Sequence, residues 1–300
     1  MKTITLEQLL EAGCHFGHQV TRQNPKARDY IFEARDNVHI IDLAKTKEEL
    51  EKAAQFIKTT AQNGGTMLVV GTKRQAHPIL DDAMKKATEQ DITGIFIAKN
   101  RWIGGTLTNF SEVVKNFKKL KEITQLLQSE EQRDKYTKKE LGLFEKERIK
   151  LQSFYGGIAD MEKLPDVLFI IDTHLETLAV LEALKMGIKT VGIVDTNANP
   201  EIITYPIPAN DDAVGSIGLI TNYIFDAWIE GKKEPKTEQN HESGVMNQEG
   251  KSAEKKKTPK TEKNEETKLA DKKEKVAKDP ATEDAPKKKA RKKKEEAPVA

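Results

Sequence analysis

Four short apolar runs set the pattern of the chain: "TMLVVGT" (66–72), "GIFIA" (94–98), "DVLFIID" (166–172) and "TVGIVDT" (190–196). Each is rich in β-branched or aromatic residues and shows no alternation with polar ones. This pattern is typical of strands that are buried on both faces of a sheet. A fifth run, "IITYPIP" (202–208), contains two prolines, which exclude it from the centre of a sheet and predict an edge strand.

Helical patterns lie between or after these runs. "HPILDDAMKKATEQ" follows the first run, "HLETLAVLEALKMG" follows the third, and "NDDAVGSIGLITNYIFDAWIEG" comes last. Gly187 and Gly231 stand where helix C-caps are expected. Because strands and helices alternate, the sequence predicts an α/β fold, a doubly wound parallel sheet with helices on both faces.

One segment interrupts this alternation. Residues 109–155 are charged and helical in pattern, and their apolar residues recur at three- and four-residue spacing on either side of the polar stretch "QSEEQRDKYTKK". Such a narrow apolar seam is typical of helices that pair with each other. We expect an inserted antiparallel helical hairpin, of coiled-coil type, that projects from the sheet domain towards a partner.

The composition changes at Lys232. Residues 232–300 contain no Phe, Tyr or Trp and carry 21 Lys and Arg against 15 Asp and Glu. Such a segment cannot bury enough apolar surface to offset the entropy of ordering it, so we predict a disordered C-terminal tail that either solubilises the protein or attracts RNA loosely. The expected organisation is as follows: N-terminal arm and first half of the α/β domain (1–108), hairpin (109–155), second half of the domain (156–231) and tail (232–300).

The charge balance restricts how the folded part can bind nucleic acid. Of the totals of 50 basic and 48 acidic residues, 29 and 33 lie before Lys232, so the body is acidic overall. Affinity for phosphates follows the local density of Lys and Arg, and RNA contact therefore needs a local patch. The single cysteine, the interrupted apolar pattern of the N-terminus and the shortness of every apolar run lead us to expect a cytoplasmic protein without a signal peptide or membrane span.

The stretch "EAGCHFGHQ" (11–19) brings three potential metal ligands together: Cys14, His15 and His18. The residues alone leave three interpretations open, namely a zinc site, a catalytic Cys/His pair, or side chains that only pack and hydrogen-bond. A tetrahedral zinc site needs a fourth ligand, and none lies nearby in the sequence.

Ligands of an open parallel sheet bind beyond the carboxyl ends of its strands. No glycine-rich phosphate loop follows the first strand, since "VVGTKRQAH" has a single glycine. Asp172 with His174, and Asp195, follow later strands. The two aspartates could hold a metal or act as acid and base in an enzyme, or they could cap helices and form loop hydrogen bonds, which the architecture favours. Asp195, Asp211 and Asp212 are a further candidate set, of oxygen ligands for a cation.

Basic and aromatic residues gather beyond the second strand. In "AKNRWIGGTLTNF" (98–110), Arg101 is suited to phosphate pairing and Trp102 to stacking on a base. Lys73 and Arg74 follow the neighbouring strand, which would make one basic edge; alternatively, Trp102 is part of the core and Arg101 pairs with an acid.

The N-terminal region holds a second basic segment. In residues 21–43, four basic side chains interleave with aromatic ones: Arg22, Lys26, Arg28 and Arg35 with Tyr30 and Phe32. The spacing is compatible with an extended arm along RNA and equally with an ordinary surface loop.

Seven strings carry a resemblance: "AGCHFGHQ", "NPKARDYIFEARDNVHIIDLAKT", "VGTKRQA", "NRWIGGTLTNF", "GGIADMEKLPDVLFIID", "GIVDTNANP" and "IPANDDA". In this order they resemble the family of bacterial small-subunit ribosomal protein two, from about residue 1 to residue 231. The resemblance implies a doubly wound domain with a helical hairpin, no enzymatic activity, no cofactor and no small-molecule substrate. It also implies binding to small-subunit ribosomal RNA between head and body, contact with neighbouring small-subunit proteins, and a part in docking ribosomal protein one.

The resemblance implies roles for individual residues as well. Phosphate neutralisation and shape recognition of folded RNA are expected from Lys26, Arg28, Lys73, Arg74, Arg101, Trp102, Lys118 and Lys119. A zinc site built on Cys14 is not implied, because the family usually has an apolar residue at that position. His15 and His18 are then expected to pack and hydrogen-bond in a turn.

Two interpretations from other classes of protein compete with this one. The first is a doubly wound enzyme that acts on a small molecule through Asp172, His174 and Asp195. The missing phosphate loop and the hairpin insertion count against it. The second is an adaptor that binds a protein partner with the hairpin alone.

Overall fold

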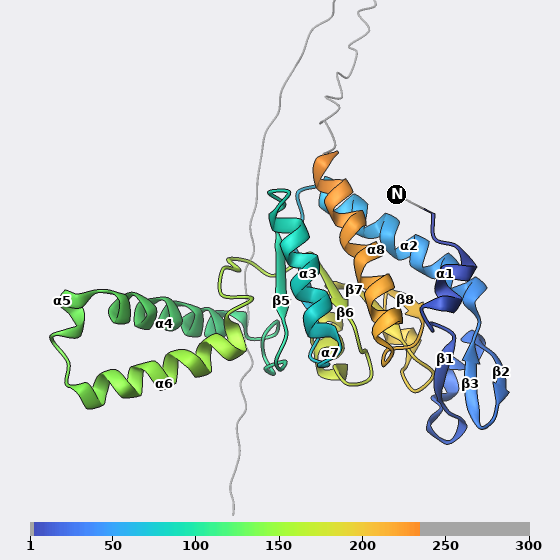
Figure 1. Ribbon diagram of the computed structural model, residues 1–300, viewed down its shortest axis with the longest axis horizontal. Helices are drawn as coiled ribbons and strands as arrows, with labels where there is room; N and C mark the ends of the chain where they lie inside the picture. The colour runs from blue at the N-terminus through green and yellow to red at the C-terminus, as the bar shows by residue number, and fades with distance from the viewer. Residues whose placement is uncertain (1–2, 235–300) are drawn as a thin grey trace, which may run out of the picture. The chain divides into compact units, whose positions relative to one another are not determined.

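The structure, a computed structural model, describes residues 3–234, and at its centre lies a five-stranded parallel sheet in the order β5-β4-β6-β7-β8 (Figure 1). The strands are β4 (Met67–Val70), β5 (Ile95–Ala98), β6 (Val167–Ile170), β7 (Lys189–Val194) and β8 (Tyr205–Pro208). Every neighbouring pair is parallel. The five predicted strands are confirmed, and β8 lies at an edge because its prolines cannot donate to a further strand.

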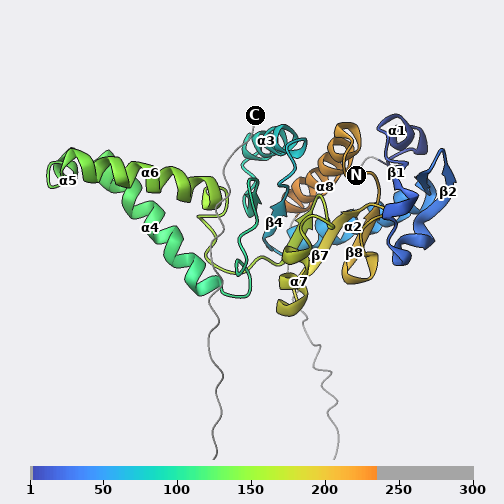
Figure 2. The same cartoon turned by 90° about the horizontal axis from the view of Figure 1, so that it is seen from below.

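Helices cover both faces of the sheet. Successive strand side chains point to opposite faces, so Val69 and Phe169 enter one hydrophobic core while Leu68 and Ile170 enter the other. The first core lies under α2 (Leu43–Gln62), α3 (Ala76–Thr88) and α8 (Val214–Lys233), and the second under α7 (Thr177–Met186) and the base of α4 (Phe110–Gln128). Figure 2 shows α3 and α8 on one side of the strands and α7 on the other. No helix among residues 3–234 has the length and apolar character that crossing a membrane requires.

Residues 109–155 form helices and contain no strand. Helix α4 and helix α6 (Lys138–Tyr155) contact each other, and the short helix α5 (Glu130–Arg133) lies between them in the chain. Phe117 and Leu120 of α4 are buried, whereas the only buried residue of α6 is Tyr155, at its end. The pair extends away from the sheet (Figure 1).

The N-terminal region is neither the extended arm nor the ordinary surface loop that were considered for residues 21–43. It folds into a second sheet, antiparallel and in the order β1-β3-β2. Asp36 and Asn37 have φ angles of 50° and 64°, as a two-residue hairpin turn between β2 and β3 requires. This turn gives the segment backbone partners within the protein, so it does not extend as an arm. The elements are α1 (Leu6–Glu11), β1 (Phe16–Gln19), η1 (Val20–Arg22), η2 (Pro25–Tyr30), β2 (Ile31–Arg35) and β3 (Val38–Ile41).

The two predicted helix caps have different outcomes. Gly187 ends α7 in the left-handed conformation, with φ 71°, as expected. Gly231 does not end α8, which continues to Lys233, two residues beyond the expected cap. Gly231 is required inside the helix, because a Cβ there would lie 2.4 Å from the carbonyl oxygen of Lys58 on α2. The disordered tail was predicted for residues 232–300, and all of it from residue 235 on lies outside the described residues.

The close approach at Gly231 leads to a first prediction. Gly231→Ala should lower the free energy of unfolding by about 1–3 kcal/mol, because the methyl group must push α8 away from α2. Gly142→Ala, in the second turn of α6 with no atom within 4 Å of the added Cβ, is the matched control. It should raise stability by up to about 1 kcal/mol through helix propensity. Urea denaturation measures both; equal midpoints for the two variants would contradict the packing described.

Candidate nucleic-acid interface

Lys73 lies at the point where the sheet reverses its winding. The chain passes from β4 to β5 on one side and then to β6 on the other, so the carboxyl ends of β4 and β6 flank the position where doubly wound folds usually bind ligands. The Lys73 ammonium fills this position: its Nζ lies 2.8 Å from Asp172, 2.7 Å from Asp211 and 2.8 Å from Asp212. It also donates to the main-chain oxygen of Asp211 at 2.9 Å.

This cluster changes the acidity of its members. Burial opposes the charged form of Lys73, but the field of Asp211 and the hydrogen bonds to all three carboxylates outweigh it and raise the pKa of Lys73. Burial raises the pKa of Asp211 to about 7, and the charges of Asp172 and Asp195 act in the same direction. The hydrogen bond from Lys73 is the main cause of the lowered pKa of Asp212.

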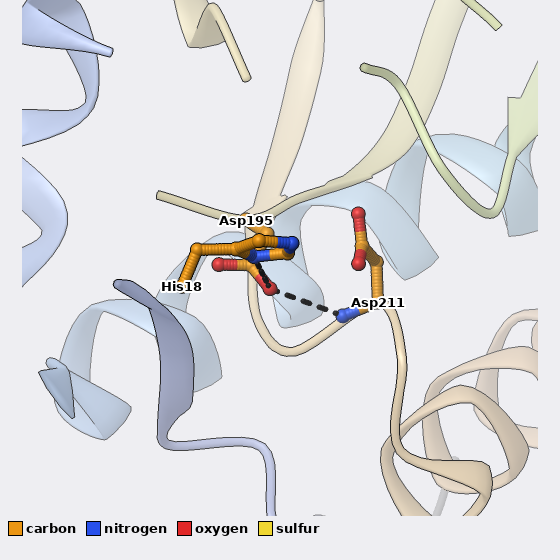
Figure 3. Close-up of side chains that lie close together, drawn as sticks. All are labelled: His18, Asp195 and Asp211. Carbon is orange, nitrogen blue, oxygen red and sulfur yellow. Dashed lines mark hydrogen bonds and ion pairs between the residues drawn. The ribbon is translucent and has the colours of Figure 1, made fainter. Parts of the chain in front are cut away.

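His18 joins the same cluster from β1. Its Nδ1 lies 3.0 Å from Asp195 Oδ2, and the Asp211 amide donates to that same oxygen at 3.5 Å (Figure 3). The hydrogen bond with Asp195 is the main cause of the raised pKa of His18. His18, Asp195 and Asp211 each offer one metal-ligand atom within 4.8 Å of the others. Of the predicted oxygen ligands Asp195, Asp211 and Asp212, only the first two belong to this group, and His18 is its third member. Asp211 already has a positive neighbour, the Lys73 ammonium.

Cys14 and His15 lie outside this group. The Cys14 side chain is fully buried, and burial raises the pKa of its thiol. The His15 ring lies against the Phe16 ring, with 4.0 Å between centroids. Only His18 of the "CHFGH" stretch therefore contributes a ligand atom to the group described above.

The strand-end carboxylates hold the surrounding loops in place. Asp172 Oδ1 accepts the amide hydrogens of His174 at 2.9 Å and Leu175 at 2.7 Å, while its Oδ2 pairs with Lys73. Asp195 accepts from the amide of Thr196 at 2.5 Å and pairs with His18. These contacts confirm the predicted loop hydrogen bonds, and they favour a structural role over acid–base catalysis.

A buried glutamate organises the loop that follows β5. Glu182 of α7 is 6% exposed and points into residues 102–108. Its Oε1 accepts from the Trp102 indole at 3.1 Å and the Gly105 amide at 2.8 Å; its Oε2 accepts from the Leu107 and Thr108 amides at 3.0 and 3.2 Å and from the Thr108 hydroxyl at 3.3 Å. Burial alone would raise the pKa of Glu182, but the backbone donors outweigh it and hold this pKa below its usual value.

Sequence reasoning missed Glu182. A single carboxylate within the apolar stretch "AVLEALKM" was the available signal, because a charge on a buried helix face needs partners. The partners were not readable, since they lie more than seventy residues earlier in the chain.

The eight residues predicted to contact RNA fall into three groups. Trp102 is 6% exposed and belongs to the core, which matches the alternative considered for it. Three lysines have carboxylate partners: Lys26 with Glu201, Lys73 with its three aspartates, and Lys119 with Glu147. Four side chains are exposed and have no ion-pair partner within residues 3–234: Arg28, Arg74, Arg101 and Lys118.

Two members of the last group share one edge of the sheet. Strands β4 and β5 are parallel neighbours, and Val70 at the end of β4 pairs with Ala98 at the end of β5. Arg74 and Arg101 follow these residues by four and three positions, so both emerge beyond the carboxyl ends of adjacent strands. We call Arg74 and Arg101 the arginine edge. Its guanidinium groups are suited to bidentate pairing with phosphate.

Comparisons with known proteins were consistent with each other. The sequence model of the family described as "Ribosomal protein S2" matches residues 9–231. The protein named small ribosomal subunit protein uS2, from Fusobacterium nucleatum subsp. nucleatum, is 44% identical over 250 residues, which span 81% of this chain and 99% of that protein.

The Glu182 contacts predict a local effect of one substitution. Glu182→Gln places an amide NH₂ group against N–H donors, so we expect a loss of about 2 kcal/mol in stability. Exchange of the Gly105, Leu107 and Thr108 amide hydrogens should become at least tenfold faster, which hydrogen-exchange NMR would measure. Glu176→Gln is the control, because Glu176 is equally buried but accepts one bond, from Thr72, and has a raised pKa. Equal exchange rates in the two variants would contradict the proposed hold on the loop.

The acidity of Asp211 predicts how stability depends on pH. The folded protein keeps a proton on Asp211 up to about pH 7, whereas the unfolded chain releases it near pH 4. The folded state binds more protons in this range, so stability should fall as the pH rises from about 4 to 7. His18, with a raised pKa, acts in the same direction above about pH 6.5.

Asp211→Asn isolates this contribution, because asparagine cannot titrate. Between pH 5 and 7.5 the melting temperature of the unsubstituted protein should fall by roughly 5–10 °C more than that of the variant. Differential scanning calorimetry at several pH values would measure it. Parallel curves, or a rise with pH, would mean that Asp211 is ionised across the range.

Proposed function

The chain belongs to the ribosomal protein S2 family, and from this premise we propose that it is a structural protein of the small ribosomal subunit that binds ribosomal RNA with the arginine edge. The proposed role is a scaffold for assembly and translation in the cytoplasm, and an enzymatic role is not favoured. Family membership supports the first part of the proposal, and the position of Arg74 and Arg101 supports the second.

The single observation that carries the RNA contact is the pairing of β4 with β5. It sets two exposed arginines, neither paired with a carboxylate within residues 3–234, beyond neighbouring strand ends. Sheet and loop fix their backbones, so only the two side chains, and not the segments that carry them, would lose freedom on meeting phosphates. Phosphate contact positions the protein on folded RNA by shape, with little reading of base sequence.

The other six residues that were predicted to contact RNA have different proposed roles. Arg28 and Lys118 are exposed and extend the interface to η2 and to α4. Lys26 and Lys119 would exchange a carboxylate for a phosphate on binding. Lys73 and Trp102 would act through the fold, by fixing the segments that carry Arg74 and Arg101.

The proposal also covers protein partners. We propose that α4 and α6 form a coiled-coil arm that reaches neighbouring small-subunit proteins, since they extend away from the sheet and do not close its core. Participation in docking ribosomal protein one is proposed on the family resemblance. A role as an adaptor through the hairpin alone is less favoured, because it gives no function to the arginine edge.

The test is binding of the full chain to small-subunit ribosomal RNA across a salt series. Arg74→Ala with Arg101→Ala should weaken binding roughly 10- to 100-fold at moderate salt and reduce the slope of log affinity against log salt by about 2, one for each lost phosphate contact. Filter binding would measure both quantities.

The matched control removes two cations from the end of the sheet where the strands begin, opposite the arginine edge. Lys163 precedes β6 and Lys85 lies in the last turn of α3, so Lys163→Ala with Lys85→Ala changes net charge equally without touching the arginine edge. If both double variants lose affinity to the same extent, the contact is general charge attraction, and the proposed interface is wrong.

A further inference from the structure

Helix α7 exposes its large apolar side chains and buries its small ones. Ala179, Val180 and Ala183 face the sheet and are fully buried. Five large apolar residues of the same segment lie at the surface: Leu175 (58% exposed), Leu178 (51%), Leu181 (49%), Leu184 (58%) and Met186 (39%). We call these five residues the α7 surface.

This arrangement is the reverse of an ordinary surface helix, which turns an apolar stripe inward and a polar face outward. A helix that is apolar on all sides is normally buried on all sides. Nothing within residues 3–234 covers the α7 surface. Of the 14 large hydrophobic residues that are exposed in this part of the chain, 5 belong to the α7 surface. A concentration of this kind marks an interaction site.

The exposed charges of the segment itself, residues 175–189, have one sign, and the nearest acid of a contacting element, Glu201 of η3, is paired with Lys26. The two acids of the segment, Glu176 and Glu182, are buried and bonded to Thr72 and to the loop after β5. Lys185 and Lys189 are exposed, and neither has a carboxylate partner among the residues that the structure describes. The outer side of α7 is therefore apolar with a basic end.

We propose that the α7 surface docks an amphipathic helix of a partner protein, which covers the leucines with apolar side chains and places carboxylates against Lys185 and Lys189. RNA does not fit, because leucine side chains offer phosphates neither charge nor hydrogen bonds. A second copy fits poorly, since an antiparallel pairing would set Lys185 against the partly positive N-terminus of the other α7. The inference goes beyond the RNA contact proposed above and does not depend on it.

The experiment uses the full chain and a labelled helical peptide with leucines at i, i+3, i+4 and i+7 and glutamates beside them, together with a twin in which lysines replace the glutamates. Fluorescence anisotropy should show the acidic peptide binding at least tenfold more tightly than its twin at low salt. Leu178→Ser with Leu181→Ser should weaken binding of the acidic peptide at least tenfold. Lys185→Glu with Lys189→Glu should reverse the preference between the peptides.

The control is Leu10→Ser, a leucine that is 54% exposed on α1, which should leave binding unchanged. Because the substituted leucines lie at the surface, the variants are expected to fold, and the lysine variants leave the apolar side chains intact. Equal binding of the two peptides, or binding that survives the leucine changes, would overturn the proposal. So would a dimer in sedimentation equilibrium that the leucine changes dissociate, which identifies a second copy as the occupant, or tighter binding to anionic lipid vesicles than to the acidic peptide.

Discussion

Glu182 carries negative charge into a position that is 6% exposed, where five donors from the loop after β5 converge on its two oxygens. A carboxylate buried in this way is stable only if its donors stay in place, so the loop has little freedom. Arg101 directly precedes the loop and α4 begins soon after it. The direction of the arginine and the start of the hairpin thus depend on one side chain of α7. The contacts of Glu182 place its side of α7 against the protein, and the leucines of the helix lie at the surface.

A second, partly buried charge network fills the place where a doubly wound sheet would bind a ligand. Lys73 and its three aspartates close the crevice between β4 and β6 from within. The next residue, Arg74, is exposed. Two adjacent cations thus have opposite roles, one holding the strand ends together and the other available to a partner. The sheet serves as a scaffold, and the protein's own side chains fill the region beyond the carboxyl ends of its strands.

Much of the fold followed from local pattern, and much of the site did not. The strands were readable because unalternated apolar runs such as "MLVV" and "VLFI" have few other uses, and the prolines of β8 marked an edge. The N-terminal sheet was missed, although Asp36 and Asn37 form a recognisable hairpin turn, because the basic residues around them suggested an RNA arm. The burial of Trp102 and the pairing of Lys73 depend on residues about 80 to 140 positions away, and local pattern carries no information about such distances.

Whether the arginine edge meets RNA would be visible in a cryo-EM reconstruction of a small subunit that contains this chain. Phosphate oxygens should lie within hydrogen-bond distance of the Arg74 and Arg101 guanidinium groups, with the Glu182 contacts to the loop unchanged. A subunit in which both arginines face solvent or protein, and ribosomal RNA lies against another surface of the chain, would contradict the proposed contact.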